Sequence, residues 1–169
     1  MSVALDMVKG GSSTESEDLK ASYLKSLKMI ELLHRLLLDV IKDEFERLGR
    51  SDINSVQALL LFNIGEAELT AGELRSRGYY LGSNVSYNLK KLVDLGFIRH
   101  ERSDSDRRSV RVSLTEAGLE VCRIVDGLYE RQLLSVEKVG GLDKDKLDQM
   151  TSSLFLLERF WADQIRFRL

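Results

Sequence analysis

The stretch GSNVSYNLKKLVDLGFIRHERSDSDRRSVRVSLT, residues 82–115, decides the fold of this chain. Its first part predicts a helix over residues 83–95, because Ser83 is a good N-cap and apolar residues then recur at helical spacing. One side of this helix carries an apolar stripe about 100° wide, which is the width that packs on a core. The opposite side carries hydrogen-bonding and cationic side chains, namely Ser83, Asn84, Tyr87, Lys90 and Lys91.

Two strand-like runs follow this helix, and a charged turn separates them. Gly96 is placed to end the helix as a left-handed cap. In the second run apolar and polar residues alternate, as in a half-buried strand, with Val110, Val112 and Leu114 pointing one way. The segment SDSDRR between the runs is rich in Ser and Asp, which favour turns. The hairpin is rich in arginine, at positions Arg99, Arg102, Arg107, Arg108 and Arg111.

The order of helix, strand, charged tip and strand predicts a winged helix-turn-helix that binds double-stranded DNA. Polar and cationic side chains on such a helix contact base edges and phosphates in a major groove. An arginine at a hairpin tip can enter a narrow minor groove, although a solvated edge hairpin blunted by charge has the same pattern. We predict that the base contacts come from Ser83, Asn84 and Tyr87, the phosphate contacts from Lys90 and Lys91, and the minor-groove contact from Arg108 with Arg107 or Arg102.

The segment before the helix, ELTAGELRSRGYY over residues 68–80, predicts the first helix of the helix-turn-helix. Thr70 and Glu73 have the spacing of a capping box, so this helix is expected over residues 70–77. It would cross the DNA backbone and offer Arg75 and Arg77 to phosphates.

From about residue 56 to 125 the chain resembles the MarR family of winged-helix regulators. The run SDSDRRSVRVSLTEAG matches the family's wing motif, Asp-x-Arg-Asp-x-Arg, followed by a strand and Leu-Thr-x-x-Gly. Asp106 and Arg108 occupy the last Asp and Arg of that motif, whereas Ser103 and Ser105 replace the earlier Asp and Arg. Arg102 or Arg107 could supply the guanidinium group that Ser105 lacks. By this resemblance, Asp106 orients the wing and Arg108 reaches the minor groove.

The resemblance also implies properties of the whole protein. Members of the family dimerise through their terminal helices, and often respond to a small, commonly aromatic or anionic ligand bound between the dimer region and the DNA-reading head. The stretch GSNVSYNLKKLVDLGFI further resembles an alphaproteobacterial branch, some of whose members regulate cell-envelope remodelling genes.

The segments on either side predict dimerisation helices. Residues 1–17 are small, polar and aperiodic, which predicts a flexible arm, and residues 18–49 predict one long helix with a broad apolar face. The winged helix occupies 50–115, with Ser51 or Asp52 capping its first helix, and residues 116–169 predict C-terminal helices that complete the dimer region. The expected homodimer contacts are apolar: Leu24, Leu27, Leu33, Leu154, Leu157, Phe160, Trp161 and Phe167.

The composition and charge of the sequence limit what the protein can bind and where in the cell it acts. The 169 residues carry a net charge of −2, but residues 73–111 hold nine Lys and Arg against five Asp and Glu. A basic middle between acidic flanks fits a protein that meets DNA with one face. The sequence has neither a signal peptide pattern nor an apolar run long enough for a membrane span, so we expect a cytoplasmic protein without a membrane partner.

The sequence contains no motif of an enzyme, a metal site or a cofactor site, so none of these is predicted. His34 and His100 have no neighbour at metal-ligand spacing, and the single cysteine, Cys122, is expected to be a buried structural thiol. Two alternatives to a DNA-binding regulator stay open: a winged-helix adaptor whose basic wing binds an acidic protein, and a redox switch that acts through Cys122.

Overall fold

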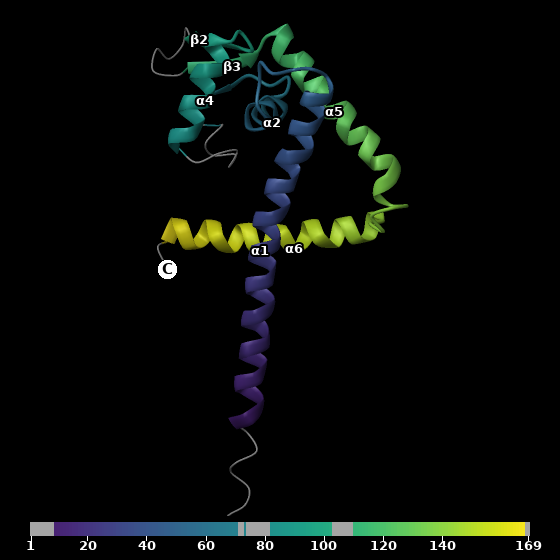
Figure 1. Ribbon diagram of the computed structural model, residues 1–169. Helices are drawn as coiled ribbons and strands as arrows, with labels where there is room; N and C mark the ends of the chain where they lie inside the picture. The colour runs from purple at the N-terminus through teal and green to yellow at the C-terminus, as the bar shows by residue number, and fades with distance from the viewer. Residues whose placement is uncertain (1–8, 71–72, 74–81, 103–109, 168–169) are drawn as a thin grey trace, which may run out of the picture. The chain divides into compact units, whose positions relative to one another are not determined.

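The computed structural model describes residues 9–70, 73, 82–102 and 110–167. Only the backbone is described for residues 9–14, 70, 82–86, 100, 102 and 110. The chain divides between Cys122 and Arg123 into two compact units. The described elements are mainly α-helical with a small sheet (Figure 1), as the sequence predicted.

Helix α1, Lys9–Arg47, is a single helix of 39 residues, about 58 Å long at about 1.5 Å per residue (Figure 1). The predicted flexible arm is therefore wrong for residues 9–17, which are helical. The chain contains no proline, and extending an existing helix costs much less than starting one. The helix thus continues through Gly10 and Gly11 despite the low helix propensity of glycine.

Helix α2, Ser55–Ile64, packs at the C-terminal end of α1, where Ile41 and Phe45 are buried. Its N-cap is Asn54, and not the predicted Ser51 or Asp52. The Asn54 side chain accepts a hydrogen bond from the backbone N–H of Gln57, while the Gln57 side chain accepts one from the backbone N–H of Asn54. Asn54 lies just before the apolar run of α2, whereas the Asp52 carboxylate accepts hydrogen bonds from Arg50. The α2 residues that form the core are Ala58, Leu59, Leu60, Leu61 and Ile64.

Three short antiparallel strands form the sheet, in the order β1-β3-β2: β1 is Leu69–Thr70, β2 is Ile98–Arg102 and β3 is Val110–Leu114. Strands β2 and β3 are the two runs that the sequence predicted. Val112 and Leu114 are buried, which confirms the predicted inner face for these two residues. Strand β1 was not predicted, because two residues carry no recognisable alternation.

Helix α4, Gly82–Asp94, corresponds closely to the predicted reading helix. The residue that caps its C-terminal end is Gly96, whose φ of 79° lies in the left-handed region that glycine adopts without strain. The backbone N–H of Gly96 donates to Val93 at 3.0 Å and that of Phe97 to Leu92 at 2.9 Å, which is a Schellman cap. Phe97, the residue after this cap, is buried, and β2 begins directly after it. The chain therefore turns from α4 into β2 within a few residues.

Helix α5, Glu116–Val136, begins against this same turn. The Thr115 hydroxyl donates to the Gly96 carbonyl at 2.7 Å and accepts from the Gly118 N–H at 3.3 Å. A Cβ on Gly118 would lie 2.3 Å from the Phe97 carbonyl oxygen, so this position requires glycine. The start of α5 is thereby fixed to the junction between α4 and β2.

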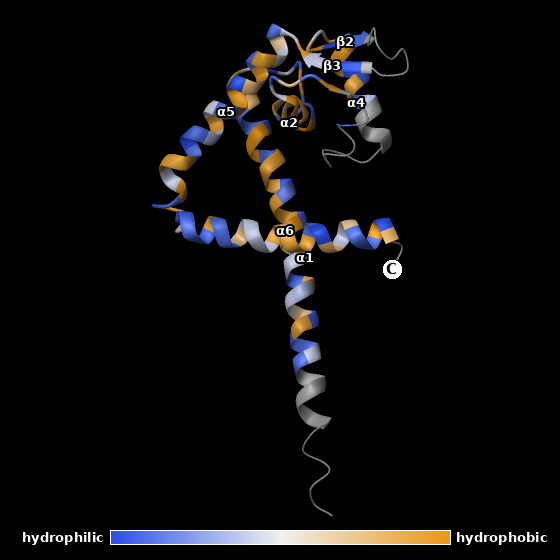
Figure 2. Cartoon of the chain, turned by 180° about the vertical axis from the view of Figure 1, so that it is seen from behind, coloured by the Kyte–Doolittle hydropathy of each residue, from blue (hydrophilic) through white to orange (hydrophobic). Residues whose placement is uncertain are grey.

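The second unit contains the last helix, α6, Lys144–Phe167. The Asp143 side chain accepts a hydrogen bond from the backbone N–H of Lys146 at 2.9 Å, so Asp143 caps the helix. None of the side chains of α6 is buried, although apolar residues recur along it (Figure 2). In the described ranges, no helix combines the length and apolarity needed to cross a membrane.

Candidate nucleic-acid interface

Helix α4 has a polar outer side and an apolar inner side. Tyr87 is 67% exposed and Lys90 and Lys91 are exposed, whereas Leu92 is fully buried. This confirms the predicted orientation for these residues. Ser83 and Asn84 lie in the first turn of α4, where only the backbone is described. The exposed tyrosine and lysines can approach an external polyanion, because burial of Leu92 turns the opposite side of the helix toward the core.

The wing strands place further cations at the surface of the same unit. Arg99 and Arg111 are exposed, and Arg111 lies opposite Glu101 in the β2–β3 register. A guanidinium nitrogen of Arg111 also lies 3.3 Å from a carboxylate oxygen of Glu68. No local pattern in the sequence indicates this ion pair, since the two residues are 43 positions apart. The positive charge of Arg111 is therefore partly compensated within the protein.

Several predicted contact residues lie outside the described residues: Arg75, Arg77, Asp106, Arg107 and Arg108. The predicted helix over residues 70–77 also falls largely outside them, although Thr70 itself is found in strand β1. Arg102 ends strand β2 opposite Val110 and has only its backbone described.

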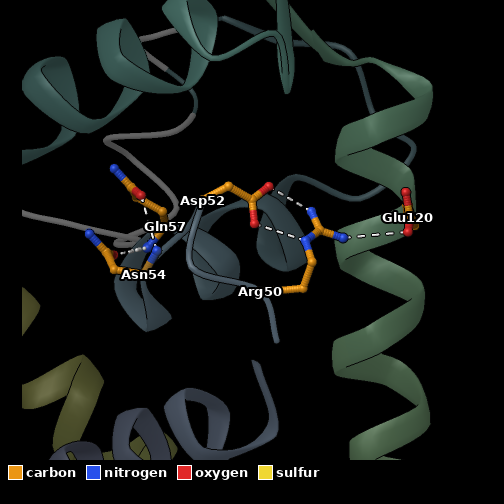
Figure 3. A network of polar contacts seen from close by, with 5 residues as sticks. All are labelled: Arg50, Asp52, Asn54, Gln57 and Glu120. Atoms are coloured by element: carbon orange, nitrogen blue, oxygen red, sulfur yellow. Dashed lines mark hydrogen bonds and ion pairs between the residues drawn. The ribbon is translucent and has the colours of Figure 1, made fainter. Parts of the chain in front are cut away.

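A cluster of charged residues that the sequence did not reveal joins α5 to the connection between α1 and α2 (Figure 3). Two guanidinium nitrogens of Arg50 donate to the two carboxylate oxygens of Asp52, at 2.8 and 2.9 Å. The third nitrogen, Nη1, lies 3.4 Å from a carboxylate oxygen of Glu120 in α5. The hydrogen bonds from Arg50 lower the pKa of Asp52, and the same contact raises the pKa of Arg50.

This cluster predicts a small dependence of stability on acid pH. Because the folded-state pKa of Asp52 lies below its unfolded value, its ion pair stabilises the fold above the unfolded pKa and is lost as pH falls through the folded pKa. Asp52→Asn should therefore lower the free energy of unfolding by less than about 1 kcal/mol at neutral pH, because the pair is partly exposed. Urea titrations at pH 7 and pH 3 should show this difference shrinking at the lower pH; a difference that grows would contradict the assignment.

A small cavity lies beside the same cluster, with a volume of about 230 Å³. Phe45 and Ile53 contribute apolar surface to it, and Lys42 and Arg50 contribute cationic groups. The other lining residues are Glu46, Ser51, Asn54 and Ser55. All of them belong to the end of α1, the beginning of α2 or the connection between these helices.

Cys122, the single cysteine of the chain, is half-buried, and its thiol donates to the Leu61 carbonyl at 3.3 Å. This position partly agrees with the predicted buried thiol. Among the described residues, no group of three or more His, Cys, Asp and Glu side chains has the arrangement of a metal site.

Comparison with known proteins identifies the family. The sequence profile of the MarR family matches residues 51–109, which contain α2, α4 and the first wing strand, β2. The exopolysaccharide II synthesis transcriptional activator ExpG of Rhizobium meliloti (strain 1021) is 36% identical over 156 residues, covering 90% of this chain and 78% of ExpG. The chain belongs to the MarR family. It is therefore a DNA-binding transcriptional regulator and not an enzyme, and its similarity to ExpG agrees with the predicted alphaproteobacterial branch.

Solved structures show that the MarR fold extends over most of the chain. A Listeria monocytogenes MarR family regulator, complexed with a 26mer DNA, has a TM-score of 0.70 and 19% identity, covering 82% of this chain and 89% of that one. Streptococcus pneumoniae FabT, in complex with DNA, has a TM-score of 0.62 and 22% identity, covering 83% of this chain and 98% of that one. At these identities the likeness concerns the fold.

Lys91→Ala should weaken binding to specific and random DNA alike, because an exposed lysine on the outer side of α4 would contact phosphate. The slope of log affinity against log salt should fall by about one unit. Fluorescence anisotropy over a salt series measures both quantities, with Lys28→Ala on α1 as the charge-matched control. Equal slopes for Lys91→Ala and the wild type would remove Lys91 from the interface.

Proposed function

We propose that this MarR-family regulator acts as a homodimer on a pseudo-palindromic operator. Each subunit places α4 in a major groove and its wing in the flanking minor groove. The observation that carries the proposal is the exposed Tyr87, Lys90 and Lys91 on a helix that runs through a tight cap into the wing strand β2. Because DNA lies in the bacterial cytoplasm, we place its activity there.

The apolar surface of the terminal helices supports the homodimer. On α1, Leu24 and Leu33 are 46% and 51% exposed, and on α6, Phe160 and Phe167 are 50% and 61% exposed. Exposed apolar area of this extent is unfavourable in water, at about 25 cal/mol per Å². A second copy of the chain would cover it through the predicted contact residues, which are Leu24, Leu27, Leu33, Leu154, Leu157, Phe160, Trp161 and Phe167.

Sedimentation velocity tests this arrangement directly. The free protein should sediment as a dimer, and a saturating amount should place two chains on one duplex that carries an inverted repeat. The duplex with one half-site scrambled should bind more weakly, because the second reading helix loses its base contacts. A monomer at micromolar concentration, or one chain per duplex at saturation, would contradict the proposal.

Arg108→Ala should weaken operator binding by about 1–3 kcal/mol, the cost of one lost specific contact. Resemblance to the family's wing motif supports this role, because Arg108 matches the arginine that reaches the minor groove, where the electrostatic potential is most negative in narrow tracts. Binding isotherms on operator and random duplexes measure the effect, and Arg35→Ala at an exposed position of α1, outside the wing and α4, is the charge-matched control. An unchanged dissociation constant for Arg108→Ala would reject this role.

We also propose that a small aromatic or anionic ligand modulates DNA binding. The cavity beside Arg50 supports this idea because Phe45 and Ile53 give it apolar surface, while Lys42 and Arg50, which are paired with Glu46 and Asp52, add charged groups at the C-terminal end of α1. Its volume of about 230 Å³ lies below the roughly 300–1,000 Å³ of pockets for drug-sized ligands, so we propose a compound no larger than a single ring. Benzoate is a suitable probe: it should raise the melting temperature of the wild type and have a smaller effect on Lys42→Ala. Equal shifts in both proteins would place the ligand elsewhere.

The similarity to ExpG, whose name describes an activator of exopolysaccharide II synthesis, supports a proposal about the target genes. We propose that this regulator controls genes for the synthesis of surface polysaccharide. Deleting its gene should change the amount of secreted polysaccharide and the transcript levels of such genes. Unchanged transcripts would assign the regulator to another set of genes.

A further inference from the structure

The DNA-reading head is the winged helix over residues 50–115. One chain segment at each end attaches it to a long helix, α1 before it and α5 after it. The chain enters the head from α1 through the connection that contains Arg50, and leaves it through Thr115 into α5. Arg50 and Glu120 stand near these two crossings and are 70 residues apart in sequence. Their contact at 3.4 Å therefore joins the entry of the head to its exit (Figure 3).

The geometry around Arg50 leaves its guanidinium group little freedom. The backbone N–H of Arg50 donates to the Phe45 carbonyl in the last turns of α1 at 2.9 Å. Asp52 holds two of the guanidinium nitrogens in a planar bidentate pair, which directs the third toward Glu120. The side chain of Arg50 is 24% exposed, so it lies against the protein. A chain of contacts thus runs from α1 through Arg50 to α5.

We propose that Arg50 is a positioning residue that fixes the angle at which α1 and α5 carry the reading head. This inference rests on the proposed homodimer, in which two α4 helices must be about one DNA turn apart to bind together. A variable angle would leave each head competent to bind but would lower the effective concentration of the second head at its half-site. Arg50 would then control binding to the whole operator and leave binding to one half-site unaffected.

A role in general stability would have a different signature. The buried side chains Leu60, Leu61 and Leu92 form the core, and loss of the Arg50–Glu120 contact uncovers none of them. Glu120 is 57% exposed, and ion pairs this exposed contribute little to the free energy of unfolding. The discriminating quantity is therefore the ratio of the affinity for a full inverted repeat to the affinity for a single half-site.

A double-mutant cycle with Glu120→Ala and Arg50→Ala, each in the full-length protein, tests the inference. Glu120→Ala should lower the ratio by about two- to fivefold, the range expected from a partly exposed ion pair, with an unchanged melting temperature and half-site affinity. Arg50→Ala should lower the ratio at least as much, and adding Glu120→Ala to it should have no further effect. Glu120→Ala alone tests the contact if Arg50→Ala does not fold.

Two matched controls separate positioning from loss of charge. Arg47→Ala breaks a similar bidentate pair, with Glu44 inside α1, and should leave the ratio unchanged. Glu130→Ala removes an exposed acid from the same helix as Glu120 and should do the same. A wild-type ratio of one would overturn the proposed dimer function and this inference with it. A high wild-type ratio that Glu120→Ala leaves unchanged would overturn the inference alone.

Discussion

Replacing Leu92 with alanine should lower the free energy of unfolding by about 2–5 kcal/mol, the usual cost of truncating a fully buried leucine. Leu92 has no exposed surface, and it lies on the inner side of α4, one turn before the cap that leads into β2. The loss is a large share of the roughly 5–15 kcal/mol that stabilises a typical domain. Urea unfolding followed by circular dichroism measures it.

Tyr87→Ala is the matched control, because Tyr87 is on the same helix and 67% exposed. Its effect on the free energy of unfolding should stay within about 0.5 kcal/mol. Tyr87→Ala should lower DNA affinity more than Leu92→Ala does, since Tyr87 is a proposed base contact while Leu92 acts only through packing. Equal unfolding costs for the two variants would mean that α4 is not packed as described.

Leu154→Glu should convert the dimer to monomers and abolish tight operator binding. Leu154 lies on α6, none of whose side chains is buried within the chain, and the proposed partner subunit would have to bury the new carboxylate without a counter-charge. A monomer retains only half-site affinity, so binding to the full site should fall by about 10²–10⁴-fold. Light scattering and anisotropy measure the two effects.

Ser152→Glu on the same helix supplies the control, because its hydroxyl is exposed and bonds only the Asp148 carbonyl among the contacts described. This variant should remain dimeric. Truncation after Leu147 removes most of α6 and should give monomers or aggregates. A well-behaved dimer from the truncated chain, or from Leu154→Glu, would refute the proposed role of the terminal helices.

The sequence predicted the elements whose signals are local. The helical spacing that ends at Gly96 indicated α4, and the alternation of Val112 and Leu114 indicated the second wing strand. Both patterns reflect burial on one side of an element, so they are visible in a few consecutive residues.

Features that depend on distant residues could not be predicted. The pairs Arg50–Glu120 and Glu68–Arg111 join segments that meet only in the folded chain. Strand β1 exists because Leu69 pairs with Val112, and two residues alone do not reveal a strand. The extension of α1 to Lys9 depends on the helix that follows it, whereas the composition of residues 9–17 alone resembles a flexible arm.

The central claim is that two reading heads, each with α4 and its wing, bind one duplex together. Selection of bound sequences from a random DNA pool tests it most directly, because the protein itself picks out its operator from all possible sequences. We expect enrichment of an inverted repeat whose half-sites are centred about 10–10.5 base pairs apart. Recovery of a lone half-site without symmetry, or of no motif at all, would contradict the claim.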